Sequence, residues 1–327
     1  MKAIRQTTFG GTETLYIGET TQPTISVDEI LIEVHYAALN RADILQRQGK
    51  YPPPKGESTI LGLEASGIIK EVGKNVKSYK IGDKVMALLA GGGQAEYVAV
   101  HQNLAMSIPP NITLEQAAAI PEVFLTAYQA LFLESKTPPS ATVLIHAGAS
   151  GVGTAAIQLA KAKECTVITT SSTAKLATCK QLGANLAIDY TTQNFDKEVI
   201  DYTNGKGVNI ILDFIGAPYF EQNLKSIALD GTLMMISVMG GIKLERLNLY
   251  PILSKRVTVK GTTLRARTIG YKKELITAFF NDFEADLASS KIAPVIDSVF
   301  SWQEIKKAHT YMEANKNKGK VVLKVKA

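Results

Sequence analysis

The stretch His146-Ala-Gly-Ala-Ser-Gly-Val-Gly153 decides the fold. It follows a short apolar run at 142–145 and leads into 151–163, where apolar residues recur at helical spacing. Glycines at such a strand-to-helix turn let the backbone approach a pyrophosphate, and the helix N-terminus offers N–H groups to its oxygens. The spacing departs from the plain G-x-G-x-x-G fingerprint, so the alternative is a tight turn without a ligand. The context favours a dinucleotide-binding turn made by Gly148, Ala149, Ser150, Gly151, Val152 and Gly153.

Strands and helices alternate on the carboxy-terminal side of this turn. Apolar runs at 166–169, 186–189, 208–213 and 232–238 predict further strands, and helices are predicted at 173–182, 195–202 and 219–228. Gly183 stands where the first of these helices needs a left-handed cap. Strands buried on both faces and separated by helices are typical of a doubly wound parallel sheet. We therefore predict an α/β fold of the Rossmann type.

The two ends of the chain differ from this centre. Short strand-like runs at 29–39, 67–73, 82–85 and 95–100 are punctuated by glycine, which indicates a small β-rich domain. Thr113 and Gln116 form a capping-box pattern, and the tail from 263 is mixed α and β. Because one hydrophobic core rarely grows past about 250–300 residues, a chain of 327 residues predicts two domains.

The end of the second central strand bears on the choice of dinucleotide. NAD-preferring sites place an Asp or Glu there to bind the ribose hydroxyls. This chain has Thr169-Thr-Ser-Ser172 instead, with Lys175 close behind. Ser172 as a helix N-cap and Lys175 as a surface lysine are the alternative. The missing acid and the nearby base favour NADPH, held at its 2′-phosphate by Ser171, Ser172 and Lys175.

Composition excludes several classes of protein. The net charge is +6, but the lysines are scattered and no basic stripe alternates with aromatics, so nucleic-acid binding has little support. Cys165 and Cys179 fall on apolar positions and are predicted to be buried core residues. No apolar run of 18 residues predicts a membrane span, and the first residues, MKAIRQTTFG, do not resemble a signal peptide. We expect a cytoplasmic protein.

Several longer motifs carry a family resemblance. ALNRAD (38–43), ILGLEASG (60–67), GGGQAEYV (91–98), AAAIPE (117–122), IHAGASGVGTAAIQLA (145–160) and MEANKNKGKVVL (312–323) resemble the zinc-free quinone oxidoreductase branch of the medium-chain dehydrogenase/reductase superfamily. The resemblance runs over essentially the whole length. It implies a GroES-like catalytic domain at 1–122 and 263–327, a Rossmann NADPH-binding domain at 123–262, and a homodimer.

The same resemblance implies the site residues. It places Asn40, Asp43 and Tyr51 in the catalytic cleft beside the nicotinamide, where Asn40 and Tyr51 would also contact the cofactor. In that arrangement Asp43 orients Asn40, and Tyr51 hydrogen-bonds a developing oxyanion. Without the family resemblance, the local sequence favours the alternatives, in which Asn40 caps a turn, Asp43 pairs with Arg41 or Arg47, and Tyr51 merely precedes prolines. Further cofactor contacts implied by the family are Thr126, Tyr190, Met239, Gly240 and Asn315.

Metal chemistry is not expected. Zinc enzymes of the superfamily take a cysteine within the ALNRAD region and a histidine just before the Glu of ILGLEASG, but this chain has Asn40 and Leu63 there, and only Glu64 remains. Two cysteines and four scattered histidines do not build the usual tetrahedral zinc site. His146 is predicted to be a positioned turn residue rather than a ligand.

An acceptor reduced without a Lewis acid must take hydride readily, as quinones do. We therefore predict an NADPH-dependent quinone oxidoreductase that is zinc-independent. An enoyl or alkenal reductase acting on conjugated carbonyls shares the scaffold and is one alternative. An NADPH-binding protein with a regulatory or RNA-contacting role is the alternative from another class.

Overall fold

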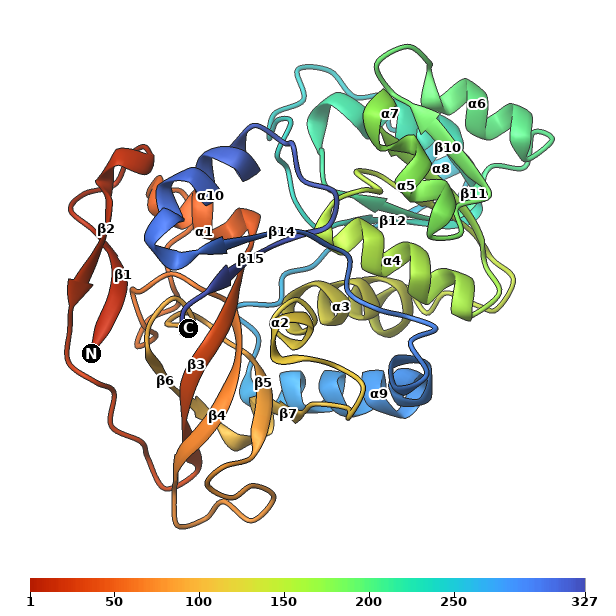
Figure 1. The fold of residues 1–327 in the computed structure, drawn as a ribbon. Helices are drawn as coiled ribbons and strands as arrows, with labels where there is room; N and C mark the ends of the chain where they lie inside the picture. Colours follow the sequence, from red (N-terminus) through yellow and green to blue (C-terminus); the bar gives the residue numbers. More distant parts are fainter. Residues whose placement is uncertain (327) are drawn as a thin grey trace. The chain divides into compact units, whose positions relative to one another are not determined.

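The computed structural model describes residues 1–326 and divides them into two compact units (Figure 1). The first contains residues 1–125 and those from 264 onward, and the second is Thr126–Thr263. We predicted divisions after residues 122 and 262. The first observed division lies within one continuous helix, α3 (Pro121–Tyr128), which no break in the sequence pattern marks.

A six-stranded parallel sheet forms the second unit, in the order β10-β9-β8-β11-β12-β13. The first strand along the chain, β8, lies in the centre, and its Val143, Leu144 and Ile145 are fully buried. The order reverses between β8 and β11, and ligands of doubly wound sheets bind at the carboxyl ends of the strands at such a switch point. This confirms the predicted Rossmann fold. The strands are β8 (Thr142–Ile145), β9 (Thr166–Ser171), β10 (Leu186–Asp189), β11 (Val208–Asp213), β12 (Ile227–Met235) and β13 (Thr258–Gly261).

Helices connect these strands close to the predicted positions. Gly183 has φ +109°, as its capping position requires. One helix is shifted: α7 was predicted at 219–228 but begins two residues earlier, and Ile227 already belongs to β12. The helical elements of this unit are η3 (Gln129–Glu134, a π-helix), α4 (Gly151–Ala162), η4 (Thr173–Lys175), α5 (Leu176–Gln181), α6 (Phe195–Tyr202), α7 (Ala217–Ser226) and α8 (Tyr250–Ser254).

Both ends of the chain build the seven-stranded sheet of the first unit. Its path is β14-β15-β3-β4-β5-β7, with β6 paired to β3, and β1 and β2 form a separate ribbon. The carboxy-terminal β15 pairs antiparallel with β3, so Val322 lies beside Ala38. The strands are β1 (Lys2–Gln6), β2 (Leu15–Glu19), β3 (Glu29–Leu39), β4 (Glu64–Val72), β5 (Lys84–Leu88), β6 (Tyr97–His101), β7 (Ala105–Ser107), β14 (Ile296–Ser301) and β15 (Lys320–Lys324).

Helices complete the first unit. Phe279 of the long helix α9 packs between Phe124 and Phe283, with ring centroids 6.1 and 6.0 Å away. The predicted capping box is present: Thr113 Oγ1 accepts from the Gln116 N–H, and the Gln116 side chain accepts from the Thr113 N–H. The helical elements are η1 (Thr12–Thr14), α1 (Arg41–Arg47), η2 (Gln102–Leu104), α2 (Leu114–Ala117), α9 (Ile269–Ala288), η5 (Trp302–Glu304) and α10 (Ile305–Glu313).

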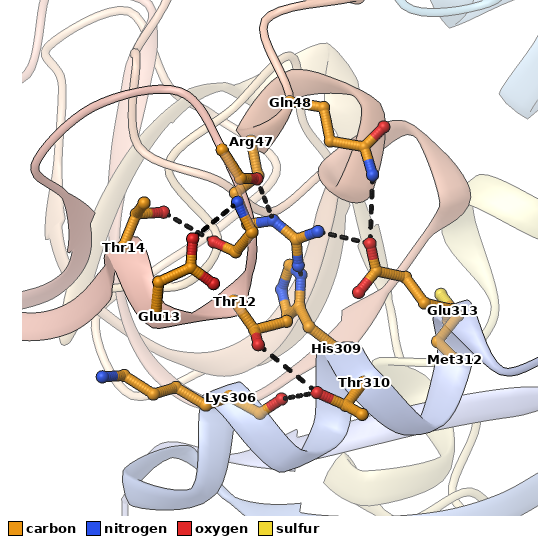
Figure 2. Close-up of polar contacts among 12 residues, drawn as sticks. Thr12, Glu13, Thr14, Arg47, Gln48, Lys306, His309, Thr310, Met312 and Glu313 are labelled. Carbon is orange, nitrogen blue, oxygen red and sulfur yellow. Dashed lines mark hydrogen bonds and ion pairs between the residues drawn. The ribbon is translucent and has the colours of Figure 1, made fainter.

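Arg47, the last residue of α1, holds three segments of this unit together. Figure 2 shows its guanidinium between the loop before η1 and helix α10. Nε donates to the Gly10 carbonyl at 3.1 Å, one Nη lies 3.1 Å from His309 Nδ1, and the other pairs with Glu313. Gln48 donates to the same Glu313 oxygen at 3.0 Å. The side chain of Arg47 is fully buried, so it acts as an internal clamp on α1.

Candidate functional site

The turn between β8 and α4 has the geometry of a dinucleotide cradle. Ala147 takes a left-handed conformation, with φ +49°. A Cβ on Gly153 would lie 2.4 Å from the Ala147 carbonyl oxygen, and one on Gly148 would lie 2.8 Å from Thr169 Cβ. Both positions therefore require glycine, because the helix begins directly against the turn. The predicted motif forms the expected strand–turn–helix, which fits the diphosphate of a dinucleotide.

Helix α4 leaves two N–H groups of its first turn without an intrahelical partner. Ser150 is its N-cap, with Oγ accepting from the Gly153 N–H at 3.0 Å. The Ser150 hydroxyl thus serves the helix rather than a ligand. Gly151 and Val152 are partly exposed, and their N–H groups are the ones left to a phosphate. Ala149 is buried and contributes backbone only.

A buried hydrogen-bond chain braces the strand ends beneath this turn. His146 Nδ1 lies 2.9 Å from Thr170 Oγ1, and its Nε2 lies 2.7 Å from Asn223 Oδ1. The amide nitrogen of Asn223 donates to Asp213, so its oxygen faces His146 and Nε2 carries the imidazole proton. Burial lowers the pKa of His146 to about 4, which keeps the ring neutral. The ring orders the turn, as predicted. Sequence analysis did not find Asn223, whose role depends on contacts distant in the chain.

The residues predicted to contact the 2′-phosphate gather at one end of the sheet. Ser171 ends β9, and the Tyr190 N–H donates to its carbonyl at 3.3 Å. Ser172 and Lys175 are half-buried and Tyr190 is 48% exposed, whereas Ser171 is only 3% exposed. The Ser171 side chain therefore lies under the surface.

Sequence analysis missed a carboxylate in this group. Asp189 ends β10, directly beside Ser171 in the parallel register. It accepts hydrogen bonds from Thr173 and Thr191, and these hydroxyls lower its pKa. Asp189 is 5% exposed and is turned toward its own loop. The signal was available, since Asp189 is the last residue of a predicted strand.

The remaining predicted cofactor contacts are scattered. Gly240 donates to the Ile215 carbonyl at 2.8 Å and Met239 to that of Phe214, so the loop after β12 is tied to the end of β11. Thr126 lies in α3 and is half-buried. Asn315 belongs to the first unit, where its side-chain oxygen accepts from Arg41 at 2.6 Å. Contact of these residues with a cofactor stays a prediction.

In the first unit, Asn40 lies within a buried ionic cluster. Lys320 Nζ donates to Asn40 Oδ1 at 2.7 Å, to Glu64 Oε1 at 2.6 Å and to the Leu39 carbonyl at 2.8 Å. Asn40 Nδ2 in turn donates to Glu64 Oε1 at 2.9 Å. The exposed fractions of Lys320, Glu64 and Asn40 are 3%, 0% and 8%. Both the oxygen and the nitrogen of the Asn40 amide therefore already have protein partners, which fix the orientation of the amide.

The Asp43 carboxylate accepts hydrogen bonds from backbone N–H groups rather than from a side-chain cation. Its carboxylate accepts from the N–H groups of Asn40 and Gly62, both at 2.8 Å, and it completes a capping box with Asn40. The suggested pairing of Asp43 with Arg41 or Arg47 is wrong, because those arginines contact Asn315 and Glu313. Asp43 is fully buried, so it orients Asn40 only through the backbone. Burial raises its pKa to about 6.

Tyr51 is half-buried beside Arg265. The guanidinium carbon of Arg265 lies 5.3 Å from the centre of the tyrosine ring, and its nitrogens donate to Ala90 and Gln46. Within residues 1–326 the Tyr51 hydroxyl has no hydrogen-bond partner, which leaves it for a ligand. Burial and the nearby Glu122 raise the pKa of Tyr51, so the phenol is protonated at neutral pH.

Glu122 is a further titratable group beside this cluster. Its N–H donates to Glu64 Oε2 at 2.9 Å. Its own Oε2 is buried and has no hydrogen-bond partner among the described residues. Lys272 lies nearby and donates to the Arg265 carbonyl at 2.8 Å. Glu122 and Lys320 belong to two motifs that carried the family resemblance, but nothing local assigned a role to either.

Across the described part of the chain, no three His, Cys, Asp or Glu side chains come together as a possible metal site. Within residues 1–326, none of the helices combines the length and the apolar composition needed to cross a bilayer.

Comparison with known sequences identifies both halves of the chain. Residues 26–110 match the family of the alcohol dehydrogenase GroES-like domain, and residues 151–280 match that of the zinc-binding dehydrogenase. The chain is 31% identical to quinone oxidoreductase-like protein 2 of Bos taurus, over 95% of this chain and 89% of that protein. It is also 31% identical to 2-methylene-furan-3-one reductase of Solanum lycopersicum, over 99% and 79%.

Solved structures share the complete fold. An NAD-dependent alcohol dehydrogenase superposes with a TM-score of 0.89 and 29% identity, covering 100% of both chains. A mycobacterial protein solved in complex with NADPH has a TM-score of 0.88 and 30% identity, over 99% of this chain and 100% of that one. Together with the glycine turn and the GroES-like sheet, these similarities establish that the chain is an oxidoreductase of the quinone oxidoreductase branch of the medium-chain dehydrogenase/reductase superfamily.

Proposed function

We propose that this protein is an NADPH-dependent reductase that transfers hydride to quinones without a metal ion. The nicotinamide supplies the hydride when NADPH is bound. The turn at Gly148–Gly153 would hold the diphosphate, with Gly151 and Val152 offering N–H groups. Ser172, Lys175 and Tyr190 would hold the 2′-phosphate, and Asp189, which is engaged by Thr173 and Thr191, would not face it.

The proposal rests on one observation: protein donors already occupy both oxygens of the Glu64 carboxylate. In the family's zinc enzymes a metal takes its ligands from this region, but here Glu64 already accepts from Lys320, from the Asn40 amide and from the Glu122 N–H. An ammonium thus supplies the positive charge, and Asn40 and Leu63 offer neither thiolate nor imidazole. A site of this kind suits an acceptor whose reduced form is stable, because it polarises a carbonyl only by hydrogen bonds.

Conjugated carbonyls are the second candidate class. The tomato relative is named for the reduction of an enone, and the Tyr51 hydroxyl would serve an enolate oxygen as well as a quinone oxygen. A quinone and an enone differ in the basicity of the product anion, so a reductase can act on both.

A steady-state screen tests the proposal. Quinones, enals and enones are assayed with NADPH and with NADH, in the presence of a strong chelator and after exhaustive dialysis against it. We expect quinone turnover with NADPH, undiminished by chelation. Activity that is lost on chelation and restored by zinc would contradict the metal-free mechanism, and equal use of NADH would contradict the cofactor preference.

A further inference from the structure

The Glu64 carboxylate accepts hydrogen bonds from three fixed donors. Oε1 accepts from Lys320 Nζ and from the Asn40 amide, and Oε2 accepts from the Glu122 N–H. No described atom in this arrangement requires a proton on Glu64, because every partner is a donor. Glu64 is fully buried next to the start of helix α3.

Glu122, in contrast to Glu64, has a carboxylate oxygen without a donor among the described residues. Its Oε2 is buried without a donor, and its neighbour Glu64 repels a second negative charge. The groups facing Glu122 come from six segments: Glu64 on β4, Asp43 on α1, Lys320 on β15, Lys272 on α9, and Tyr51 and Arg265 from two separate loops. Of these, Glu64 and Asp43 oppose ionisation, while Lys320 and Lys272 favour it.

Desolvation decides the balance, with the charge of Glu64 acting in the same direction. Together they raise the pKa of Glu122 to about 8, from an ordinary value of 4.5. At pH 7 the carboxyl is thus protonated, and the residue as a whole is partly exposed although its Oε2 is buried. An acid whose pKa lies near the working pH is suited to proton transfer.

We propose that Glu122 is a further catalytic residue, the general acid that delivers a proton to the reduced acceptor. The inference rests on the proposed function. It assigns separate tasks to the two groups of the first unit that face a ligand: the Tyr51 hydroxyl binds the acceptor oxygen, and Glu122 supplies the proton.

The step balances for a conjugated ketone. Hydride from NADPH forms a C–H bond at the β-carbon, and the π electrons move to the carbonyl oxygen, so that the acceptor is reduced and the nicotinamide oxidised. The Glu122 O–H bond then breaks and its proton goes to the enolate. Water returns a proton to the Glu122 carboxylate. With a quinone, the anion is weakly basic and takes its proton from water without this acid.

The first measurement needs no cofactor. Infrared spectra of the protein should show the carbonyl stretch of a protonated carboxyl that titrates near pH 8. Glu122→Gln should remove this band, while Glu71→Gln, the matched change at an exposed position of β4, should leave it. Absence of such a band in the wild-type protein at pH 7 would overturn the inference, whatever the enzyme reduces.

The second measurement is kinetic and uses saturating NADPH. Glu122→Gln should lower turnover of an enone by about 100-fold, the usual scale for a lost general acid, and turnover of a quinone by less than roughly threefold. Enone turnover of the wild type should fall as pH rises through about 8, because the acid loses its proton there, and the variant should lack this decline. Glu71→Gln should behave as the wild type.

The two proposals fail in different ways. A wild-type protein that reduces neither quinones nor enones would overturn the proposed function and the catalytic step with it. An active wild type whose enone turnover and pH profile are unchanged by Glu122→Gln would overturn the acid alone. Equal losses on both substrates would also contradict it, since a general defect rather than proton delivery would then be the cause.

Discussion

Tyr51 offers a hydroxyl without a protein partner among residues 1–326, and it leads to a prediction at the scale of one residue. If it only positions the acceptor, Tyr51→Phe should lower quinone turnover by less than roughly tenfold, with the main effect in Michaelis constants. We expect this outcome, because a quinone's product anion is stable. The enone should lose more, since its enolate is more basic and benefits more from the hydrogen bond. Turnover on both substrates at saturating NADPH measures the difference.

A hundredfold loss of quinone turnover in Tyr51→Phe would contradict the positioning role and make the phenol the acid. Small and equal losses on quinone and enone would remove Tyr51 from the chemistry. Affinity for NADPH, measured by quenching of protein fluorescence, is the control, because the ring that remains should keep it nearly unchanged.

Lys175 allows a separate test of the cofactor preference. Lys175→Ala should weaken the binding of NADPH by about 1–2 kcal/mol, or roughly 5- to 30-fold in the dissociation constant. The binding of NADH should barely change, because only NADPH carries the 2′-phosphate. The effect should be larger at low salt. Lys180→Ala, on the exposed surface of α5, is the matched control. Equal weakening of both dinucleotides would mean that Lys175 does not contact this phosphate.

The structure also decides where an acid should be introduced for the converse experiment. Ser171 would be the choice from sequence, but its side chain is 3% exposed, so an aspartate there would have to be buried. Ser172 is half-buried and precedes η4, a position that accepts aspartate. Ser172→Asp should therefore repel NADPH selectively without the cost of burying a charge.

Single residues show how far sequence alone reaches. The need for glycine at 148 and 153 follows from a local turn, and sequence predicted it. The partner of Asn40 lies 280 residues away, so no local pattern could reveal that Lys320 fixes its amide. For Asp43, the local alternative of a pairing with Arg41 or Arg47 was wrong, and the backbone N–H of Gly62 reaches its carboxylate only in the folded chain.

Among elements, helix α1 depends on the Arg47 clamp (Figure 2). Arg47→Met keeps much of the side-chain volume but leaves His309 Nδ1 and the Gly10 carbonyl without their donor. Removing one partner of a buried pair costs about 3–5 kcal/mol, and we expect the lower end because Glu313 is 28% exposed and can be hydrated. The free energy of unfolding in urea measures this loss.

Lys306→Met, on the exposed face of α10, is the control for the same chemical change and should alter stability by less than about 0.5 kcal/mol. If both variants unfold at the same urea concentration, the clamp contributes no stability. Because α1 carries Asn40 at its N-cap and Asp43 in its first turn, loosening α1 should also lower turnover.

Elements were predictable where one periodicity ran unbroken. Helix α6 was predicted with its observed bounds, and β3 and β11 likewise. The end of α7 was wrong because Ile227, although compatible with a helix, pairs with Val208 in the sheet. Such competition between helix and strand is settled by tertiary contacts, which local sequence does not contain.

For the whole molecule, the open edge of the parallel sheet bears on assembly. Within the described residues, β13 pairs only with β12, so one side of its backbone is open. Apolar side chains are exposed on β13 and on α8 just before it: Val259 at 40%, Tyr250 at 69% and Leu253 at 76%. An exposed edge with apolar neighbours is an aggregation hazard unless another chain covers it.

A second copy is the partner we expect, because a two-fold axis beside an edge strand pairs it with itself, and a closed dimer then leaves no open edge on that side. Leu253→Glu combined with Val259→Lys should place charges in this interface and convert a dimer into a monomer at micromolar concentration, as judged by sedimentation velocity. Ile81→Glu, an exposed apolar position of the first unit, should leave the dimer intact. Turnover of the monomeric variant should persist, because no residue of the proposed site lies on β13 or α8. A wild-type protein that sediments as a monomer with full activity would show that the edge strand remains unpaired in the working enzyme.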